Sequence, residues 1–519
     1  MFYFKINFLT LMYMSQQVSS KFISLVPTNG TEFDCNLGQK VIFELQPSLG
    51  LVKGRDSYLC LDILNSSSDQ KRYGLQHSAG ADAIIDRVDI YSLRTGQHLE
   101  TMANYNQVMS MANQYFFEDK TNLQSLQGVG AETNVNSGGS PTKCVAQNIN
   151  NNQISPVDAA GNPQYNFRRF TVPLKAGIFR YWDEERLCNV MGLQGLRIEI
   201  TLSSPQEACF QLEATDGTAG TVDLVTTGLT VNDLAGAGAV LTTTNNMSVN
   251  QCGLAVGNQV EITSNVAALN TTIAAISPNG GDATKLDITL ANAQAISTGI
   301  RVKVRNDTRA LKVRPEFKVL SVAPPQSLIS EMGNGFNYEF TSYDHFVDSL
   351  PLNARKHLIE LNSVASRAVC VMTQFSDVTK LGGLENSSRY FGENPDNLKL
   401  NSVQYFLKNR LVPVRDYNPQ VTSEKIVAIN ELMKALSSIN KEPKDLGNFD
   451  GANADNYTNV FTIGRQLARD PYYYDLGNAE GQIRLGFSAA RTNDTLCDTF
   501  VWSRKIASVS DSGGVQIVL

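Results

Sequence analysis

The sequence predicts a mainly β protein in which one antiparallel β-domain occurs twice in tandem and a third, smaller β-domain is inserted. Three observations support this fold class. The same order of elements occurs in residues 86–202 and again in residues 401–487. The last segment of each copy alternates apolar and polar residues, and this two-residue period is typical of a half-buried antiparallel strand. Between the copies, residues 211–316 contain no Phe, Tyr or Trp.

The first copy begins, within residues 86–117, with a predicted hairpin in which Thr95 and Gly96 form the turn between Ile90 and Leu99. A helix is expected next, because apolar residues recur at three- and four-residue spacing. A polar loop at 118–166 leads to a strand within residues 168–179 and then to the closing strand. The helix residues are Tyr105, Val108, Ala112 and Phe116, and the inward residues of the closing strand are Leu196, Ile198, Ile200 and Leu202.

The second copy repeats this order from residue 401. Its hairpin is predicted to turn at Asn409 and Arg410, and Ser423 is the expected N-cap of its helix. After a polar loop at 440–457, two further strands are expected. We predict one apolar helix stripe of Ile426, Ile429, Met433 and Leu436, and a closing strand that buries Ile483, Leu485 and Phe487.

Chance likeness between two β-rich segments is the alternative, but the agreement of five elements in order favours a duplication. The two polar loops follow the helix of their own copy, so they should emerge at corresponding ends and elaborate one face.

The aromatic-free stretch predicts the inserted domain at residues 214–310. The chain has 23 Phe, 18 Tyr and 2 Trp, so a run of 106 residues without any of them is unusual. Short alternating runs such as "NQVEITSN" and "KLDITLA" are separated by turn signals such as "SPNGGDA". This spacing is typical of a small immunoglobulin-like β-sandwich. The alternative is a flexible loop of low complexity.

Charge and cysteine content restrict the class of protein. The net charge is −6, so no basic field is present to bind phosphate backbones, and direct nucleic-acid binding is not expected. The eight cysteines lack any C-x-x-C spacing and are predicted to be unpaired, with Cys60 and Cys370 among the most buried. They are Cys35, Cys60, Cys144, Cys188, Cys209, Cys252, Cys370 and Cys497.

The N-terminal residues 1–14 are apolar but are interrupted by Lys5, Asn7 and Thr10. They are too short to span a bilayer and lack a small-residue cleavage site. We expect either an effective start at Met14 or an arm packed against a neighbouring subunit. A signal peptide is the alternative, and nothing else in the sequence resembles a transmembrane segment.

The search for chemistry yields no catalytic, cofactor-binding or metal-binding residues. Phosphate-loop, zinc-protease and serine-hydrolase motifs are missing from the sequence. The glycine-rich run at 234–241 has neither the helix nor the lysine of a phosphate loop. Asp183, Glu184 and Glu185 could supply carboxylates for hydrolysis or calcium, but they lack a second acidic motif. Trp182 is expected to be a packing or interface anchor, and His77, His98, His345 and His357 are isolated in sequence.

Two stretches carry a family resemblance. "FTVPLKAGIFRYWDEERLCNVMGLQGLRIEITL" and "SVQYFLKNRLVPVRDYNPQ" followed by "FTIGRQL" resemble double jelly-roll major capsid proteins of double-stranded DNA viruses. The chain looks most similar to those of polinton-like viruses and virophages. The resemblance covers residues 15–213 and 311–519. It implies a first jelly roll at 15–213 completed by 311–330, the immunoglobulin-like insert at 214–310, and a second jelly roll at 331–519.

The resemblance also implies a structural role without enzymatic activity. Homotrimers would form pseudo-hexagonal capsomers that tile an icosahedral shell, in contact with neighbouring capsomers and with minor or penton capsid proteins. The protein would be part of the virion capsid, made and assembled inside the host cell. Two rival functions remain open: a secreted or cell-surface β-sandwich adhesin, which predicts disulfides, and a carbohydrate-active enzyme, which needs two converging carboxylates.

Overall fold

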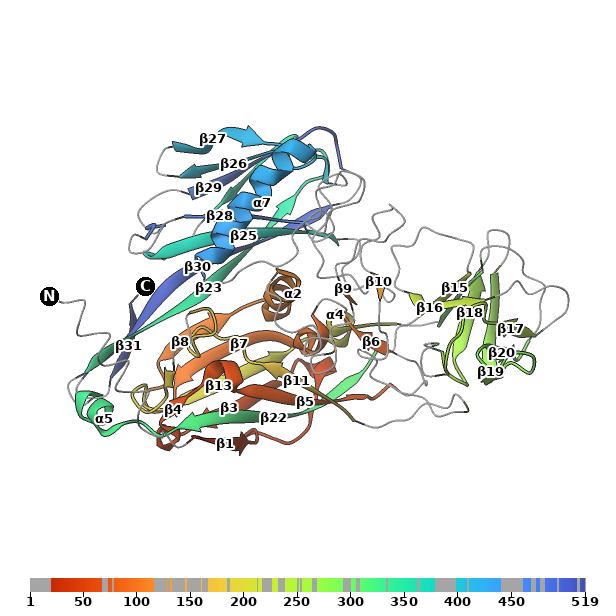
Figure 1. The fold of residues 1–519 in the computed structure, drawn as a ribbon, viewed down its shortest axis with the longest axis horizontal. Coiled ribbons are helices and arrows are strands. Elements are labelled where there is room, and N and C mark those ends of the chain that lie inside the picture. The colour runs from red at the N-terminus through yellow and green to blue at the C-terminus, as the bar shows by residue number, and fades with distance from the viewer. Residues whose placement is uncertain are drawn as a thin grey trace.

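A computed structural model describes residues 20–518 with gaps, the longest at 116–127, 133–144, 147–159, 379–397 and 440–460. Strands dominate the described residues and form two lobes side by side, with a separate β-domain beyond one end (Figure 1). The predicted mainly β fold is therefore confirmed. Among the described helices, none has the length and apolar character needed to cross a membrane.

The first lobe consists of two antiparallel sheets. The larger has the order β11-β5-β22-β4-β12, with β1 and β2 also paired to β22, and the smaller has the order β3-β13-β7-β8. Helix α2 (Tyr105–Tyr115) follows β8. The larger sheet contains β1 (Ser20–Leu25), β2 (Phe33–Asp34), β4 (Leu51–Val52), β5 (Tyr58–Asn65), β11 (Arg168–Pro173), β12 (Cys188–Asn189) and β22 (Leu311–Val322), and the smaller contains β3 (Lys40–Leu45), β7 (Ile85–Ser92), β8 (His98–Met102) and β13 (Leu196–Leu202).

Short elements complete this part of the chain. Strands β6 (Tyr73–Leu75) and β14 (Cys209–Gln211) pair with each other, as do β9 (Ala131–Glu132) and β10 (Val145–Ala146). The short helices are η1 (Cys35–Leu37), η2 (Pro47–Leu49), η3 (Gly54–Asp56), η4 (Gly80–Ile84) and α4 (Pro205–Ala208).

The second lobe repeats the first. One sheet has the order β23-β30-β25-β28, with β31 paired to β30, and the other has the order β24-β29-β26-β27. Helix α5 (Gln326–Met332) connects the lobes, and α7 (Thr422–Ser437) follows β27. The strands are β23 (Phe336–Leu350), β24 (Lys356–Glu360), β25 (Ala368–Asp377), β26 (Leu400–Leu407), β27 (Arg410–Tyr417), β28 (Thr462–Gln466), β29 (Gly481–Phe487), β30 (Thr495–Val509) and β31 (Val515–Val518).

The strand pairing confirms the duplication. In both lobes the closing strand lies between the first strand of its sheet and the first strand of the hairpin, as β3-β13-β7-β8 and as β24-β29-β26-β27. In both, a strand of the other sheet that precedes the hairpin pairs with a strand that follows the helix, as β5 with β11 and β25 with β28. Equivalent strands therefore occupy equivalent places.

Three local predictions in the second copy are wrong. Arg410 is the first residue of β27 rather than part of the turn, and Asn409 lies outside the described residues. The helix begins at Thr422, so Ser423 lies inside it, and Val421 at the N-cap makes no side-chain cap hydrogen bond. Of the predicted stripe, Ile429 and Leu436 are buried, whereas Ile426 and Met433 are 53% and 43% exposed.

The insert folds as a β-domain of its own. Its strands form one sheet of order β16-β15-β21-β18-β19-β20-β17, and an isolated bridge between Val231 and Thr243 connects the two ends of that order. The long strand β19 pairs with β18 along one part and with β20 along the other. The strands are β15 (Glu213–Asp216), β16 (Thr226–Val231), β17 (Val240–Thr242), β18 (Gln259–Thr263), β19 (Ala268–Pro278), β20 (Leu286–Leu290) and β21 (Arg301–Val304).

The hydrophobic core is also divided between the two lobes on one side and the insert on the other. One apolar cluster runs through both lobes, and a second, made of Val, Ile, Leu, Ala and Cys252, fills the insert. The seven described cysteines are buried free thiols, as predicted. Cys370 is fully buried as expected, but Cys60, at 3% exposure, is the least buried of the seven, so its expected rank is wrong. Cys144 lies outside the described residues.

Candidate assembly site

A buried carboxylate connects the two lobes. Glu100, in β8 of the first lobe, accepts hydrogen bonds from the backbone N–H groups of Gly177 and Ile178 at 2.9 and 2.8 Å. It also accepts one from the hydroxyl of Ser342, in β23 of the second lobe. Burial raises the pKa of Glu100, although the three donors favour its charged form. One side chain thus joins first-lobe backbone to a second-lobe strand.

Backbones of the two lobes meet at Gly177. A Cβ atom at this residue would lie 2.2 Å from the carbonyl oxygen of Thr341, so only glycine fits here. The backbone N–H and hydroxyl of Thr341 donate to the carboxylate of Asp183 at 3.0 and 2.6 Å. Asp183, considered above as a hydrolytic or calcium-binding residue, therefore links the lobes, whereas Glu184 and Glu185 lie outside the described residues.

Aromatic side chains fill the rest of the junction. The rings of Trp182 and Trp502, one from each lobe, are 6.1 Å apart at an interplanar angle of 77°. The hydroxyl of Tyr338 donates to the carbonyl of Ile178 at 2.7 Å, and the guanidinium of Arg180 lies 4.3 Å from the centre of the Tyr338 ring. Edge-to-face pairs and cation–π contacts add directional stabilisation to the burial of apolar area. Trp182 is the packing anchor that the sequence predicted.

Helix α2 lies between the two lobes (Figure 1). Residues 105–113 are all buried. The Gln107 side-chain amide donates to Gln374 of β25 at 2.9 Å, and the Tyr343 hydroxyl of β23 donates to the carbonyl of Ala103 at 3.2 Å. The second lobe therefore covers the side of α2 that the first lobe leaves open.

Helix α7 occupies the equivalent place in the second lobe but keeps an open side. Its inner side packs on the core through residues such as Ala428 and Leu432. Its other side exposes Ile426, Val427 and Met433, which are 53%, 39% and 43% exposed and which we call the α7 face. Contiguous exposed apolar residues on a folded domain mark interaction sites.

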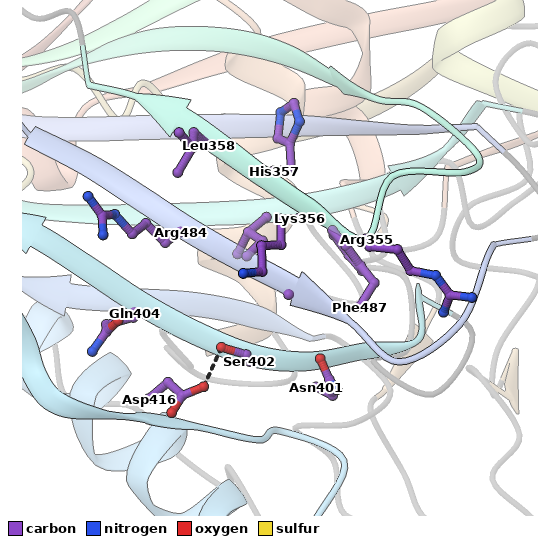
Figure 2. Close-up of a pocket in the computed structure, with 12 residues that line it drawn as sticks. Arg355, Lys356, His357, Leu358, Asn401, Ser402, Gln404, Asp416, Arg484 and Phe487 are labelled. Carbon is purple, nitrogen blue, oxygen red and sulfur yellow. Dashed lines mark hydrogen bonds between the residues drawn. The ribbon is translucent and has the colours of Figure 1, made fainter.

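A pocket of about 770 Å³ opens on the sheet β24-β29-β26-β27 of the second lobe. Figure 2 shows Lys356 and Arg484 on one side of it, and Ser402, Gln404 and Asp416 on the other. The Ser402 hydroxyl donates to Asp416 at 2.5 Å. Both signs of charge line the pocket, and hydrogen-bonding groups lie between them.

The isolated histidines pair with carboxylates at separate places. His345 Nε2 lies 2.9 Å from Asp498 Oδ1 near the lobe junction, and His357 Nε2 lies 2.9 Å from Asp348 Oδ2 beside the pocket. His98 contacts the Tyr91 ring, and His77 lies outside the described residues. In the described ranges no three His, Cys, Asp or Glu side chains are grouped to hold a metal ion.

The glycine-rich run 234–241 is described only from residue 239, and it leads into β17. No motif or spacing in the sequence singled out Glu100 or Gly177. Two features of the sequence could have indicated them. Glu100 is an acidic residue among the apolar residues of a predicted strand, and Gly177 is a glycine that closely follows another predicted strand.

Comparison with known proteins gives one consistent result. No protein family model and no curated protein sequence matches the chain. Among solved structures, PBCV-1 VP54 fitted into a reconstruction of the virophage Sputnik matches with a TM-score of 0.51 and 10% identity, covering 97% of this chain and 98% of that chain. The quasi-atomic PBCV-1 virus capsid matches with a TM-score of 0.51 and 10% identity, covering 97% of each chain. The Faustovirus major capsid protein follows with a TM-score of 0.49 and 10% identity, covering 94% and 90%. The fold of this chain is that of the double jelly-roll major capsid proteins.

Proposed function

We propose that the protein is a major capsid protein that assembles as homotrimers, in which six lobes form a pseudo-hexagonal capsomer of an icosahedral shell. The domain division is part of this proposal: a first jelly roll at 15–213 with 311–330, an insert at 214–310, and a second jelly roll at 331–519. The likeness in fold to viral capsid structures supports a capsid role.

The main support for a trimer is the difference in exposure between helices α2 and α7. Equivalent helices in equivalent lobes should have equivalent neighbours when the lobes form a ring. The second lobe covers α2 within the chain, while the α7 face stays exposed. The first lobe of another copy, placed by closed rotational symmetry, would cover α7 as the second lobe covers α2. Three copies then close a ring of six lobes.

The remaining parts of the proposal follow from a structural role. The chain would carry no enzymatic activity and would bind neighbouring capsomers and minor or penton proteins in a virion capsid assembled inside the host cell. Direct nucleic-acid binding is not expected, because the net charge is −6.

The test is the mass of the purified protein. We expect mass photometry to give three times the chain mass of 56.8 kDa and electron microscopy to show a hexagonal outline. Replacing Ile426 and Met433 together by Glu should shift the protein to monomer, because a charge buried without a partner opposes association. Val240→Glu, at a 43% exposed apolar residue of the insert, is the matched control and should leave the trimer intact.

A monodisperse wild-type monomer would contradict the proposal, and a trimer that persists in the double variant would show that α7 is not the interface. The adhesin alternative predicts a disulfide-linked product, but the seven described cysteines are free thiols, so no observation favours it.

A further inference from the structure

The pocket on the second lobe has a glycine, Gly486, in the strand that runs beneath it. Side chains alternate along β29, so Gln482, Arg484 and Gly486 face away from the core while Ile483 and Leu485 are buried. Gly486 pairs with Lys356 of β24 on one side and with Ser402 of β26 on the other. Gly486 lines the pocket, and a Cβ atom at this residue would lie 2.9 Å from the Cβ atom of Ser402, so a side chain here would crowd the pocket lining.

Two cations of this pocket, Lys356 and Arg484, are not neutralised by a described carboxylate. Neither Lys356 nor Arg484 makes an ion pair with any residue in the described part of the chain, and the Arg484 guanidinium lies 4.5 Å from the centre of the Phe406 ring. The three other titratable groups of the lining already have partners, since Arg355 donates to the carbonyl of Ser488, Asp416 accepts from Ser402, and the His357 ring contacts Asp348. Lys356 and Arg484 thus provide positive charge for a ligand.

The rest of the lining restricts the chemistry of that ligand. Asp416 carries oxygens that only accept hydrogen bonds, so it favours a ligand that also offers hydroxyl or N–H donors. Asn401, Ser402 and Gln404 add groups that can both donate and accept. Leu358, 50% exposed at the rim, offers an apolar contact. A bare inorganic anion would satisfy only the cations.

We propose that this pocket binds an acidic saccharide, with its carboxylate or sulfate group at Lys356 and Arg484 and its hydroxyls at Asp416, Ser402 and Asn401. A volume of about 770 Å³ is within the usual range for small-molecule sites and can hold two to three sugar rings. Charge-assisted hydrogen bonds to the acid group set the affinity, and the hydroxyl contacts set the preference for sugar.

The position of the pocket fits a role in the attachment of a capsid to its host cell. This role, unlike the binding itself, rests on the proposed function. The pocket includes Phe487, the last residue of β29. The counterpart of β29 in the first lobe, β13, ends at Leu202, from where the chain runs through α4 and β14 into the insert. The pocket therefore lies at the end of the second lobe that corresponds to the insert-bearing end of the first.

The test measures saccharide binding by the full chain in ~50 mM salt, because screening weakens charge contacts at higher salt. The probes are 3′-sialyllactose and a hyaluronan tetrasaccharide, with lactose and chitotetraose as neutral counterparts and sodium sulfate as the anion alone. We expect at least one acidic saccharide to bind with a Kd of about 1 mM or tighter and at least tenfold more tightly than its neutral counterpart. Replacing Lys356 and Arg484 together by Gln should weaken this binding at least tenfold.

Arg410→Gln is the matched control, since Arg410 is an exposed cation of the same sheet outside the pocket lining. This variant should bind like the wild type. Asp416→Asn should reduce the preference for the acidic saccharide over sulfate.

Three results would overturn the proposal: no acidic saccharide of the panel binds, the neutral counterpart binds equally well, or the Lys356 and Arg484 variant binds as tightly as the wild type. Resistance of Lys356 to reductive methylation in the ligand-free protein would mean that another copy covers the pocket, which also overturns it. Mass photometry of the same samples separates the two proposals. A monomer that binds saccharide contradicts only the capsomer, and a trimer that does not bind contradicts only the pocket.

Discussion

The first lobe carries ion pairs on the outward face of its four-stranded sheet, whereas Lys356 and Arg484 on the equivalent face of the second lobe make none with any described residue. In the first lobe Glu199 of β13 pairs with Lys40 at 3.2 Å and with Arg197 at 2.7 Å, and Asp89 of β7 pairs with Arg87 at 2.8 Å. In the second lobe Arg484 and Gly486 of β29 take the places of Glu199 and Thr201. The second lobe thus lacks one carboxylate and one side chain at the places where the first lobe forms its ion pairs.

Helices α2 and α7 also differ in how much of their surface is exposed. Helix α2 is buried from residue 105 to 113, while α7 exposes Ile426, Val427 and Met433. The first lobe has its partner within the chain, and the second lobe presents open surfaces. A duplicated domain can keep its framework and change function by altering outward residues alone, because the alternation of a strand separates core positions from surface positions.

The largest expected effect is at the junction that fixes the two lobes relative to each other. Gly177→Ala should reduce the free energy of unfolding by about 3 kcal/mol or more, or prevent soluble expression, because the new methyl group overlaps the backbone of Thr341. Chemical denaturation measures the change. Gly280→Ala in the insert is the matched control, because nothing lies within 4 Å of its Cβ position. Equal stability of both variants would show that the lobes are not held in contact at Gly177.

A smaller effect on the free energy of unfolding should distinguish the outward faces of the two four-stranded sheets. Burial pushes the pKa of Asp89 upward, but hydrogen bonds from Arg87 and Thr101 outweigh it and hold the pKa below its ordinary value. Arg87→Gln should therefore cost about 1 to 2 kcal/mol of unfolding free energy at neutral pH. Lys356→Gln, at a side chain that makes no ion pair with any described residue, should change the unfolding free energy by less than about 0.5 kcal/mol.

The pH dependence of the Arg87→Gln effect follows from the direction of that shift. A carboxyl group with a lowered pKa in the folded state stabilises the fold above its unfolded pKa, near 3.8, and loses this contribution as the pH falls through the folded pKa. The difference between wild type and Arg87→Gln should thus be full at neutral pH and shrink in acid. Denaturation series at several pH values measure it, and a difference that grows in acid would contradict the assignment.

Removal of the insert should have the smallest effect on the folding and assembly of the lobes. Without it, the first lobe would resemble the second lobe, which has no insert. Its strands pair only with one another, and its apolar cluster is separate from that of the lobes. Replacing residues 214–310 by a short Gly/Ser linker should preserve trimers and alter attachment to host cells or neighbouring capsomers. Phe210 and Phe317 in the joining strands stay in place. Mass photometry checks the trimer, and a well-expressed monomer would place the insert in the interface.

The sequence alone was sufficient to predict the duplication, the strand and helix order, and the unpaired state of the described cysteines. These features depend on the spacing of apolar residues along the chain, as in Leu196, Ile198 and Ile200, which repeat in Ile483 and Leu485. Local spacing records which side of a strand is buried. It does not record which partner covers it.

Tertiary structure alone decided the junction and the pocket. Glu100 meets Ser342 and Gly177 meets Thr341 across long sequence separations, so no local pattern marks those contacts. The same is true of Met433, whose helical spacing suits a core stripe although the fold turns it to the surface. Gly486 becomes the floor of a pocket only because strand register places it between Lys356 and Ser402. Register and lobe packing depend on the whole chain, and this is the physical reason why the sequence could not predict them.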